Sequence, residues 1–136
     1  MAALKLYKER YSQPNFNILK EEGDVDALLN KFYQSFFNRP DLEDGCFIIH
    51  VGTELADEDE DVQQFLRSYI NELENLFIQL LEKHSEYKSD SQFYATNLVG
   101  LFCTSMSFCL IQSDKYRKHH INNGIKVILN KEFNYA

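Results

Sequence analysis

The stretch Gly45-Cys46-Phe47-Ile48-Ile49-His50-Val51-Gly52-Thr53-Glu54-Leu55-Ala56 decides our interpretation of the fold. It is too polar for a membrane helix and too long for an ordinary strand, which indicates a short, deeply buried helix. Residues at helical spacing would share one face of it, namely Cys46, Ile49, His50 and Thr53. An apolar stripe that carries polar groups can line a pocket.

The composition predicts one all-helical globular domain. The chain has 136 residues, of which 44% are hydrophobic and 14% aromatic, so it can bury a core. Only 5 Gly and 2 Pro interrupt its apolar periods, which favours helices over strands. The net charge of -7 argues against direct binding to the phosphate backbone of a nucleic acid, because such binding needs clustered Lys and Arg.

The sequence also bears on the compartment. No apolar run reaches the ~18 residues of a bilayer span, and no secretory signal pattern opens the chain, so we expect a soluble, cytoplasmic protein without a membrane partner. Three cysteines, Cys46, Cys103 and Cys109, cannot all pair within one chain. We predict that they are free, buried thiols in a reducing compartment.

Apolar periodicity predicts five helices besides the central one. They cover residues 2–11, the segment from a cap at Asp24 to Arg39-Pro40-Asp41, and residues 61–84, 91–112 and 114–131. Pro14 is expected to stop the first helix, because proline disfavours helix in the residue before it. The acidic run 57–61 lacks the spacing of a calcium loop, and we interpret it as the cap of the long helix.

The last two helices are predicted to form a dimer interface. The first is apolar nearly all round, and its small residues would let another helix approach closely. The predicted seam comprises Thr96, Gly100, Thr104 and Ser107 on this helix, with Ile121, Gly124, Ile125 and Ile128 on the next. Two such helices from each of two chains would make a four-helix interface. The alternative is that both are ordinary core helices of a monomer.

The order of these elements resembles a known family. The chain is similar to the regulatory domain of TetR-family transcription factors. The similarity lies in Gly45-Cys46-Phe47, Glu54-Leu55-Ala56, the acidic patch, the long helix with Leu66 and Leu73 to Leu81, and the two final apolar helices. The resemblance covers nearly the whole chain as a single domain, 1–136. Residues 1–12 resemble the end of the helix that links the DNA-binding head to the body, and residues 91–131 resemble the dimerisation helices.

The resemblance implies a one-component sensor that works as a homodimer and represses transcription. A small-molecule effector would bind in this domain, the linking helix would shift, and the spacing of two DNA-reading heads would change. The family's helix-turn-helix head is absent from this chain, so any DNA contact would pass through that missing N-terminal domain. We expect the chain to be the regulatory part of a longer protein.

Candidate ligand-binding residues follow from physical chemistry, because large apolar walls with a few polar groups suit small molecules. They are Phe36, Cys46, Ile49, His50, Thr53, Tyr69, Leu73, Phe102 and Met106. Such walls would suit a flat apolar or aromatic compound, with hydrogen bonds from His50 and Tyr69. For His50, a satisfied core histidine is an equal alternative.

Catalytic motifs are absent from the sequence. It has no Gly-rich phosphate loop, no nucleophile elbow and no Glu-x-x-His pair, so we expect neither an enzyme nor a cofactor or metal. His119 and His120 are interpreted as polar surface. Three alternative functions stay open: a helical protein-interaction module, an enzyme on a helical bundle, and a redox or electrophile sensor built on Cys46 with Cys103 or Cys109.

Overall fold

The computed structural model describes residues 1–37, 47–107 and 114–130. All regular secondary structure in these ranges is helical, as predicted, and they contain no strand. The elements are α1 (Ala2–Tyr7), η1 (Lys8–Ser12), α2 (Gln13–Ile18), α3 (Val25–Phe37), α4 (Phe47–Leu55), α5 (Glu60–Glu82), η3 (Lys88–Asp90), α6 (Ser91–Ser107) and α7 (Asp114–Leu129). None of these helices is long and apolar enough to cross a bilayer.

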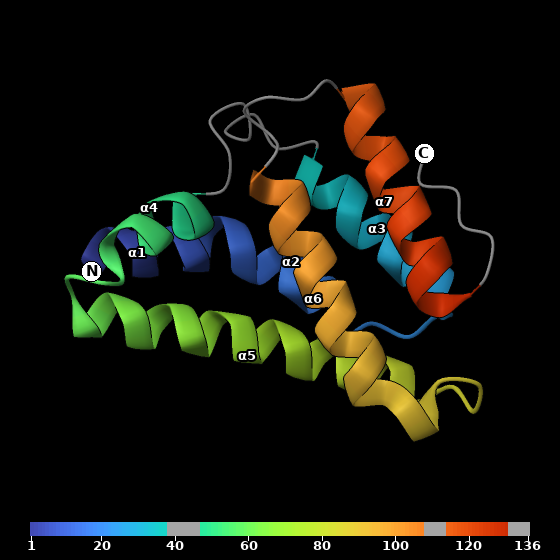
Figure 1. The fold of residues 1–136 in the computed structure, drawn as a ribbon. Helices are drawn as coiled ribbons and strands as arrows, with labels where there is room; N and C mark the ends of the chain where they lie inside the picture. Colours follow the sequence, from blue (N-terminus) through green and yellow to red (C-terminus); the bar gives the residue numbers. More distant parts are fainter. Residues whose placement is uncertain (38–46, 108–113, 131–136) are drawn as a thin grey trace.

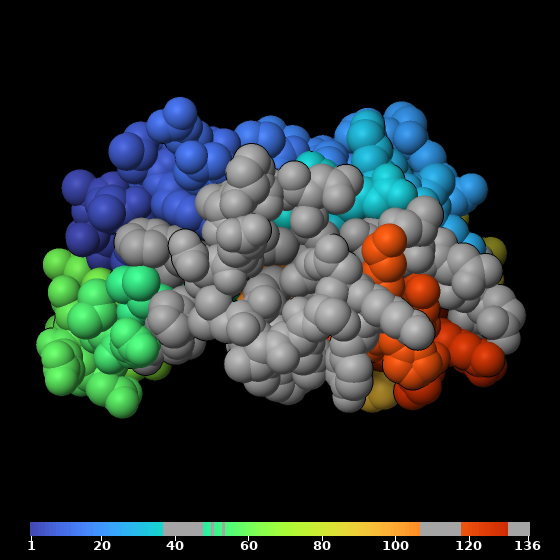
Figure 2. Space-filling view, turned by 90° about the horizontal axis from the view of Figure 1, so that it is seen from above, coloured from blue at the N-terminus to red at the C-terminus, as the bar shows by residue number. Residues whose placement is uncertain are grey.

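The long helix α5 positions the others. The N-terminal run α1–η1–α2 lies alongside it, and α4 packs on both at one end (Figure 1). Helix α6 crosses α5 towards the other end and contacts α7 on its far side. Seen from above, the N-terminal helices and α3 occupy one long edge, and α4 and α7 lie at opposite ends (Figure 2). One hydrophobic core joins all the α-helices, and α1 contributes Leu4 to it.

The first helix does not stop before Pro14, so that prediction is wrong. A π-helical turn, Lys8–Ser12, precedes Pro14 and connects α1 to α2 without a break in helical structure. Proline disrupts a regular α-helix because its ring meets the carbonyl group four residues earlier. A π-helical turn is wider, which leaves room for the ring. The segment that the sequence suggested as a connection is therefore helical as far as Ile18, and Phe16 and Leu19 are buried there.

Two acidic residues cap helices as predicted. The Asp24 carboxylate accepts a hydrogen bond from the Ala27 amide at 2.7 Å, at the start of α3. At the start of α5, the Asp59 carboxylate accepts from the amides of Asp61 and Val62 at 2.9 and 3.3 Å. Each cap satisfies amides that have no partner inside the helix.

Helix α4 is less buried than the opening stretch predicted. Ile48 and Ile49 are buried, but Glu54 and Leu55 are exposed, so the helix covers the core with one face only. Gly52 lets α5 approach closely, since a Cβ there would lie 2.6 Å from the Leu66 Cδ2 atom. Gly45 and Cys46 of the same stretch lie outside the described residues.

Helices α6 and α7 pack against each other within the chain. Ile121 and Ile125 of α7 are fully buried, and a Cβ on Gly124 would lie 2.5 Å from the Leu101 Cδ1 atom of α6. The opposite face of α6 is open: Phe93 is 66% exposed, Thr96 and Asn97 are exposed, and no atom of the described residues lies within 4 Å of a Cβ built on Gly100. Helix α6, which was expected to be apolar nearly all round, therefore has exposed polar residues on this face.

Candidate functional site

An aromatic cluster forms the centre of the core. It takes Phe16 from α2, Phe32 and Phe36 from α3, Tyr69 and Phe77 from α5, and Phe102 from α6, all fully buried. The Phe36 and Phe102 ring centroids are 4.8 Å apart in an edge-on arrangement, and those of Phe32 and Phe36 are 5.0 Å apart. Such contacts favour edge-on and offset geometries, which fix the four helices relative to one another.

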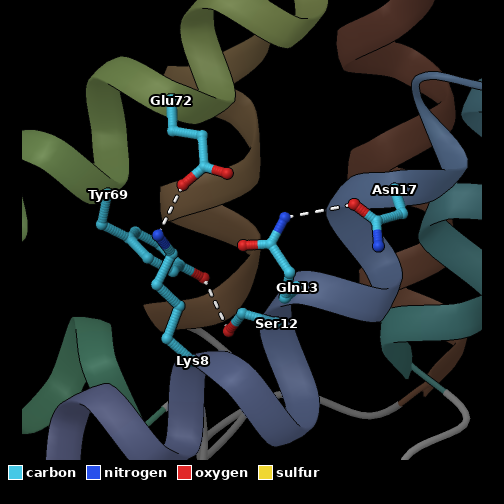
Figure 3. Close-up of polar contacts among 6 residues, drawn as sticks. All are labelled: Lys8, Ser12, Gln13, Asn17, Tyr69 and Glu72. Atoms are coloured by element: carbon cyan, nitrogen blue, oxygen red, sulfur yellow. Dashed lines mark hydrogen bonds and ion pairs between the residues drawn. The ribbon is translucent and has the colours of Figure 1, made fainter.

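A group of polar side chains lies at the edge of these rings, and we call it the polar cluster: Ser12, Asn15, Ser35 and Tyr69. The Tyr69 hydroxyl donates a hydrogen bond to the Ser12 Oγ atom at 3.1 Å (Figure 3). The Ser35 hydroxyl donates to the Asn15 Oδ1 atom, and the Asn15 amide donates to the Tyr11 carbonyl at 2.8 Å. Ser12 and Asn15 are buried, so these bonds replace contacts with water that both groups lose on folding.

The polar cluster joins the N-terminal run to two core helices. Ser12 ends the π-helical turn and bonds to α5, while Asn15 lies in α2 and bonds to α3. Nearer the surface, the Lys8 ammonium group lies 2.6 Å from the Glu72 carboxylate, one helical turn from Tyr69 (Figure 3). Short π-helical segments are frequent at functional sites.

Six of the nine predicted ligand-binding residues have described side chains, and all six are buried in the same core: Phe36, Ile49, Tyr69, Leu73, Phe102 and Met106. Cys46 lies outside the described residues, as do the side chains of His50 and Thr53. Of these six side chains, Tyr69 carries a hydroxyl, and this hydroxyl belongs to the polar cluster.

Sequence reasoning missed the other three members of the polar cluster. Ser12, Asn15, Phe16 and Leu19 recur at helical spacing, which is the signal that could have found Ser12 and Asn15. The prediction that Pro14 stops the helix hid this pattern, because it assigned Ser12 and Phe16 to different elements.

Tyr33 places a second hydroxyl in the core. Burial raises the pKa of this group well above its ordinary value, and the nearby Cys103 thiol raises it further. Cys103 itself is half-buried and not in a disulfide. Among the described residues, no group of three or more His, Cys, Asp or Glu side chains is placed to hold a metal ion.

Two grooves lie on the outer side of α5. One has a volume of about 620 Å³ and is lined by Lys20, Ser68, Asn71, Glu72, Asn75, Leu76 and Gln79. The other has a volume of about 360 Å³ and is lined by Met1, Lys5, Asp61, Gln64, Phe65 and Ser68. None of the predicted ligand-binding residues lines either groove.

The predicted dimer residues fall into two groups. Thr96 and Gly100 are exposed and Thr104 is half-buried, so a second chain could reach this part of α6. The Ser107 side chain lies outside the described residues. Ile121 and Ile125 are already fully buried by their own chain, and Gly124 and Ile128 are partly buried. A second chain would add no burial to the two isoleucines.

Comparisons with protein-family models, with curated proteins and with solved structures gave no match to this chain.

Proposed function

We propose that this chain is the ligand-sensing and dimerisation domain of a TetR-like transcriptional regulator, which binds a small apolar or aromatic effector. The proposal rests first on the resemblance of its sequence pattern to that family. The observation that carries it further is the hydrogen bond from Tyr69 to Ser12, because it links the aromatic cluster directly to the N-terminal helix.

The effector would bind beside the aromatic rings and compete for the Tyr69 hydroxyl. A ligand that accepts this hydrogen bond leaves Ser12 without its partner, and Ser12 lies at the end of the π-helical turn. The turn can then tighten towards regular α-helix and rotate the residues that precede it. The ligand acts by binding one of these two arrangements more tightly than the other.

The second part of the proposal is a homodimer that uses the open face of α6. This helix has no charged residue between Ser91 and Ser107, and its exposed side carries Phe93, Thr96, Asn97 and Gly100. The neighbouring α7 exposes Val127 to 80%. A solvated helix face ordinarily carries charged residues, so an uncharged one favours contact with another chain.

The dimer is tested by the mass of the chain in solution. Sedimentation equilibrium should give a dimer for the parent protein and a monomer for Phe93→Glu, which places a charge in the proposed seam. Leu6→Glu is the matched control, because Leu6 is a similarly exposed apolar residue on α1. A monomeric parent protein, or a Phe93→Glu variant that stays dimeric, would contradict this seam.

Effector binding is tested by thermal denaturation in the presence of a panel of planar aromatic acids, phenols and amines. A compound that binds only the folded state raises the midpoint, and the rise grows with the logarithm of its concentration once that concentration exceeds Kd. We expect at least one to do so in the parent protein and to lose its effect in Tyr69→Phe.

A further inference from the structure

The larger groove on α5 presents hydrogen-bonding groups that the fold does not use. Ser68, Asn71, Asn75 and Gln79 are exposed and lie on one face of the helix. None of these side chains makes a hydrogen bond to a described residue. Asparagine is among the poorer helix formers, so its placement at two interior positions of α5 does not serve helix stability.

The spacing of these carboxamides matches an extended polypeptide. Asn71, Asn75 and Gln79 are four residues apart in turn, which is ~6 Å along a helix. An extended chain repeats every two residues, or about 6.6 Å. Each carboxamide offers both a donor and an acceptor, so each can pair with the N–H and C=O groups of a peptide backbone.

The charged and apolar residues of the groove also suit a peptide. The Glu72 carboxylate is held by Lys8 at 2.6 Å, whereas Lys20 has no ion-pair partner among the described residues. Leu76 also lines the groove, with 5% of its surface exposed. The groove thus carries an unpaired positive charge on a chain whose net charge is -7.

We propose that the groove lined by Lys20, Asn71, Asn75 and Gln79 binds an extended peptide segment that carries a carboxylate near its C-terminus. The carboxamides hold alternate peptide units of its backbone, and Lys20 pairs with the carboxylate. This site is separate from the proposed effector site, since no residue of the aromatic cluster lines it.

The test is a titration of the ¹⁵N-labelled chain, followed by NMR of the side-chain NH₂ signals. The probe is a pool of acetylated octapeptides that is randomised at every position except a C-terminal glutamate. We expect the signals of Asn71, Asn75 and Gln79 to shift. The same pool with every backbone nitrogen methylated should shift them far less, because none of its peptide units can donate a hydrogen bond.

Variants separate this site from a structural role. Asn71→Ala with Asn75→Ala should weaken binding at least tenfold without lowering the thermal midpoint, because alanine is the better helix former. Gln92→Ala, an exposed site on α6, should bind as the parent does. Lys20→Gln should remove the preference for a C-terminal glutamate over a C-terminal amide.

Three results would overturn the proposal. The first is that the carboxamide signals do not shift at millimolar peptide. The second is that the double variant binds the peptides with the same affinity as the parent protein. The third is that the carboxamide signals shift with maltohexaose and not with peptide. None of them bears on the effector site, which is tested through Tyr69.

Discussion

The Tyr69 hydroxyl on α5 donates a hydrogen bond to the Ser12 Oγ atom across 57 positions of sequence, and both groups are buried. This bond fixes the end of the π-helical turn against the aromatic cluster. Removal of the Tyr69 hydroxyl would leave the buried Ser12 Oγ atom without this hydrogen bond, which costs more than the bond itself contributes.

Replacing Tyr69 by phenylalanine tests the strength of this link. The ring stays in place while the hydroxyl is lost, so we expect the free energy of unfolding to fall by about 1–2 kcal/mol. Urea denaturation measures the change. Tyr94→Phe is the control, because the Tyr94 hydroxyl has no hydrogen-bond partner among the described residues, and it should change stability by only a few tenths of a kcal/mol.

Substitution by alanine should change the stability of the fold differently at the two glycines of the last helices. Both substitutions improve helix propensity by about 1 kcal/mol, so their difference isolates the effect of packing. At Gly100 nothing lies within 4 Å of the new methyl group, and stability should rise. At Gly124 the methyl group meets Leu101, and we expect Gly124→Ala to be less stable than Gly100→Ala by about 1–3 kcal/mol. The comparison must be made at concentrations where both variants are monomeric.

The cap of α5 should depend on one carboxylate of the acidic run. Asp59→Ala removes the acceptor for two backbone amides and should lower the free energy of unfolding by about 1 kcal/mol. Asp57→Ala removes the same charge from the adjoining turn without removing a cap. Equal losses in both variants would mean that the run acts through its charge alone.

Tyr33 should make stability fall at alkaline pH. Its pKa is raised in the folded state, so the unfolded chain loses the proton first, near pH 10, and proton loss then favours unfolding. Below that pH both states keep the proton and the effect is absent. Tyr33→Phe should therefore reduce the loss of stability between pH 9 and pH 11, measured by urea denaturation. An unchanged slope would show that this hydroxyl is not buried in the folded state.

The helix order and both caps were predictable because they depend on local patterns. Asp24 and Asp59 each precede an apolar period, and a short acceptor side chain at that position satisfies amides close to it in sequence. Pro14 was not predictable in the same way. The usual effect of proline on helices holds for the α-form, whereas here a π-helical turn precedes Pro14, and Ser12 and Asn15 of this segment bond to α5 and α3, which are far away in sequence.

The buried set of the site was predictable and its polar edge was not. Apolar periodicity placed Phe36, Tyr69 and Phe102 on faces that meet in the core, and the structure brings them together. The partner of Tyr69 comes from an element far away in sequence, so no local pattern specifies it. Whether Cys46 and His50 join this site stays a prediction.

The central claim, that an effector at the aromatic cluster acts on the N-terminal helix, is tested most directly by hydrogen exchange. The measurement compares the backbone amides of residues 8–18 with and without the aromatic compound that most raises the thermal midpoint. The account predicts that exchange of these amides changes in the parent protein and does not change in Tyr69→Phe. A compound that binds tightly and leaves the exchange of these amides unaltered would contradict it.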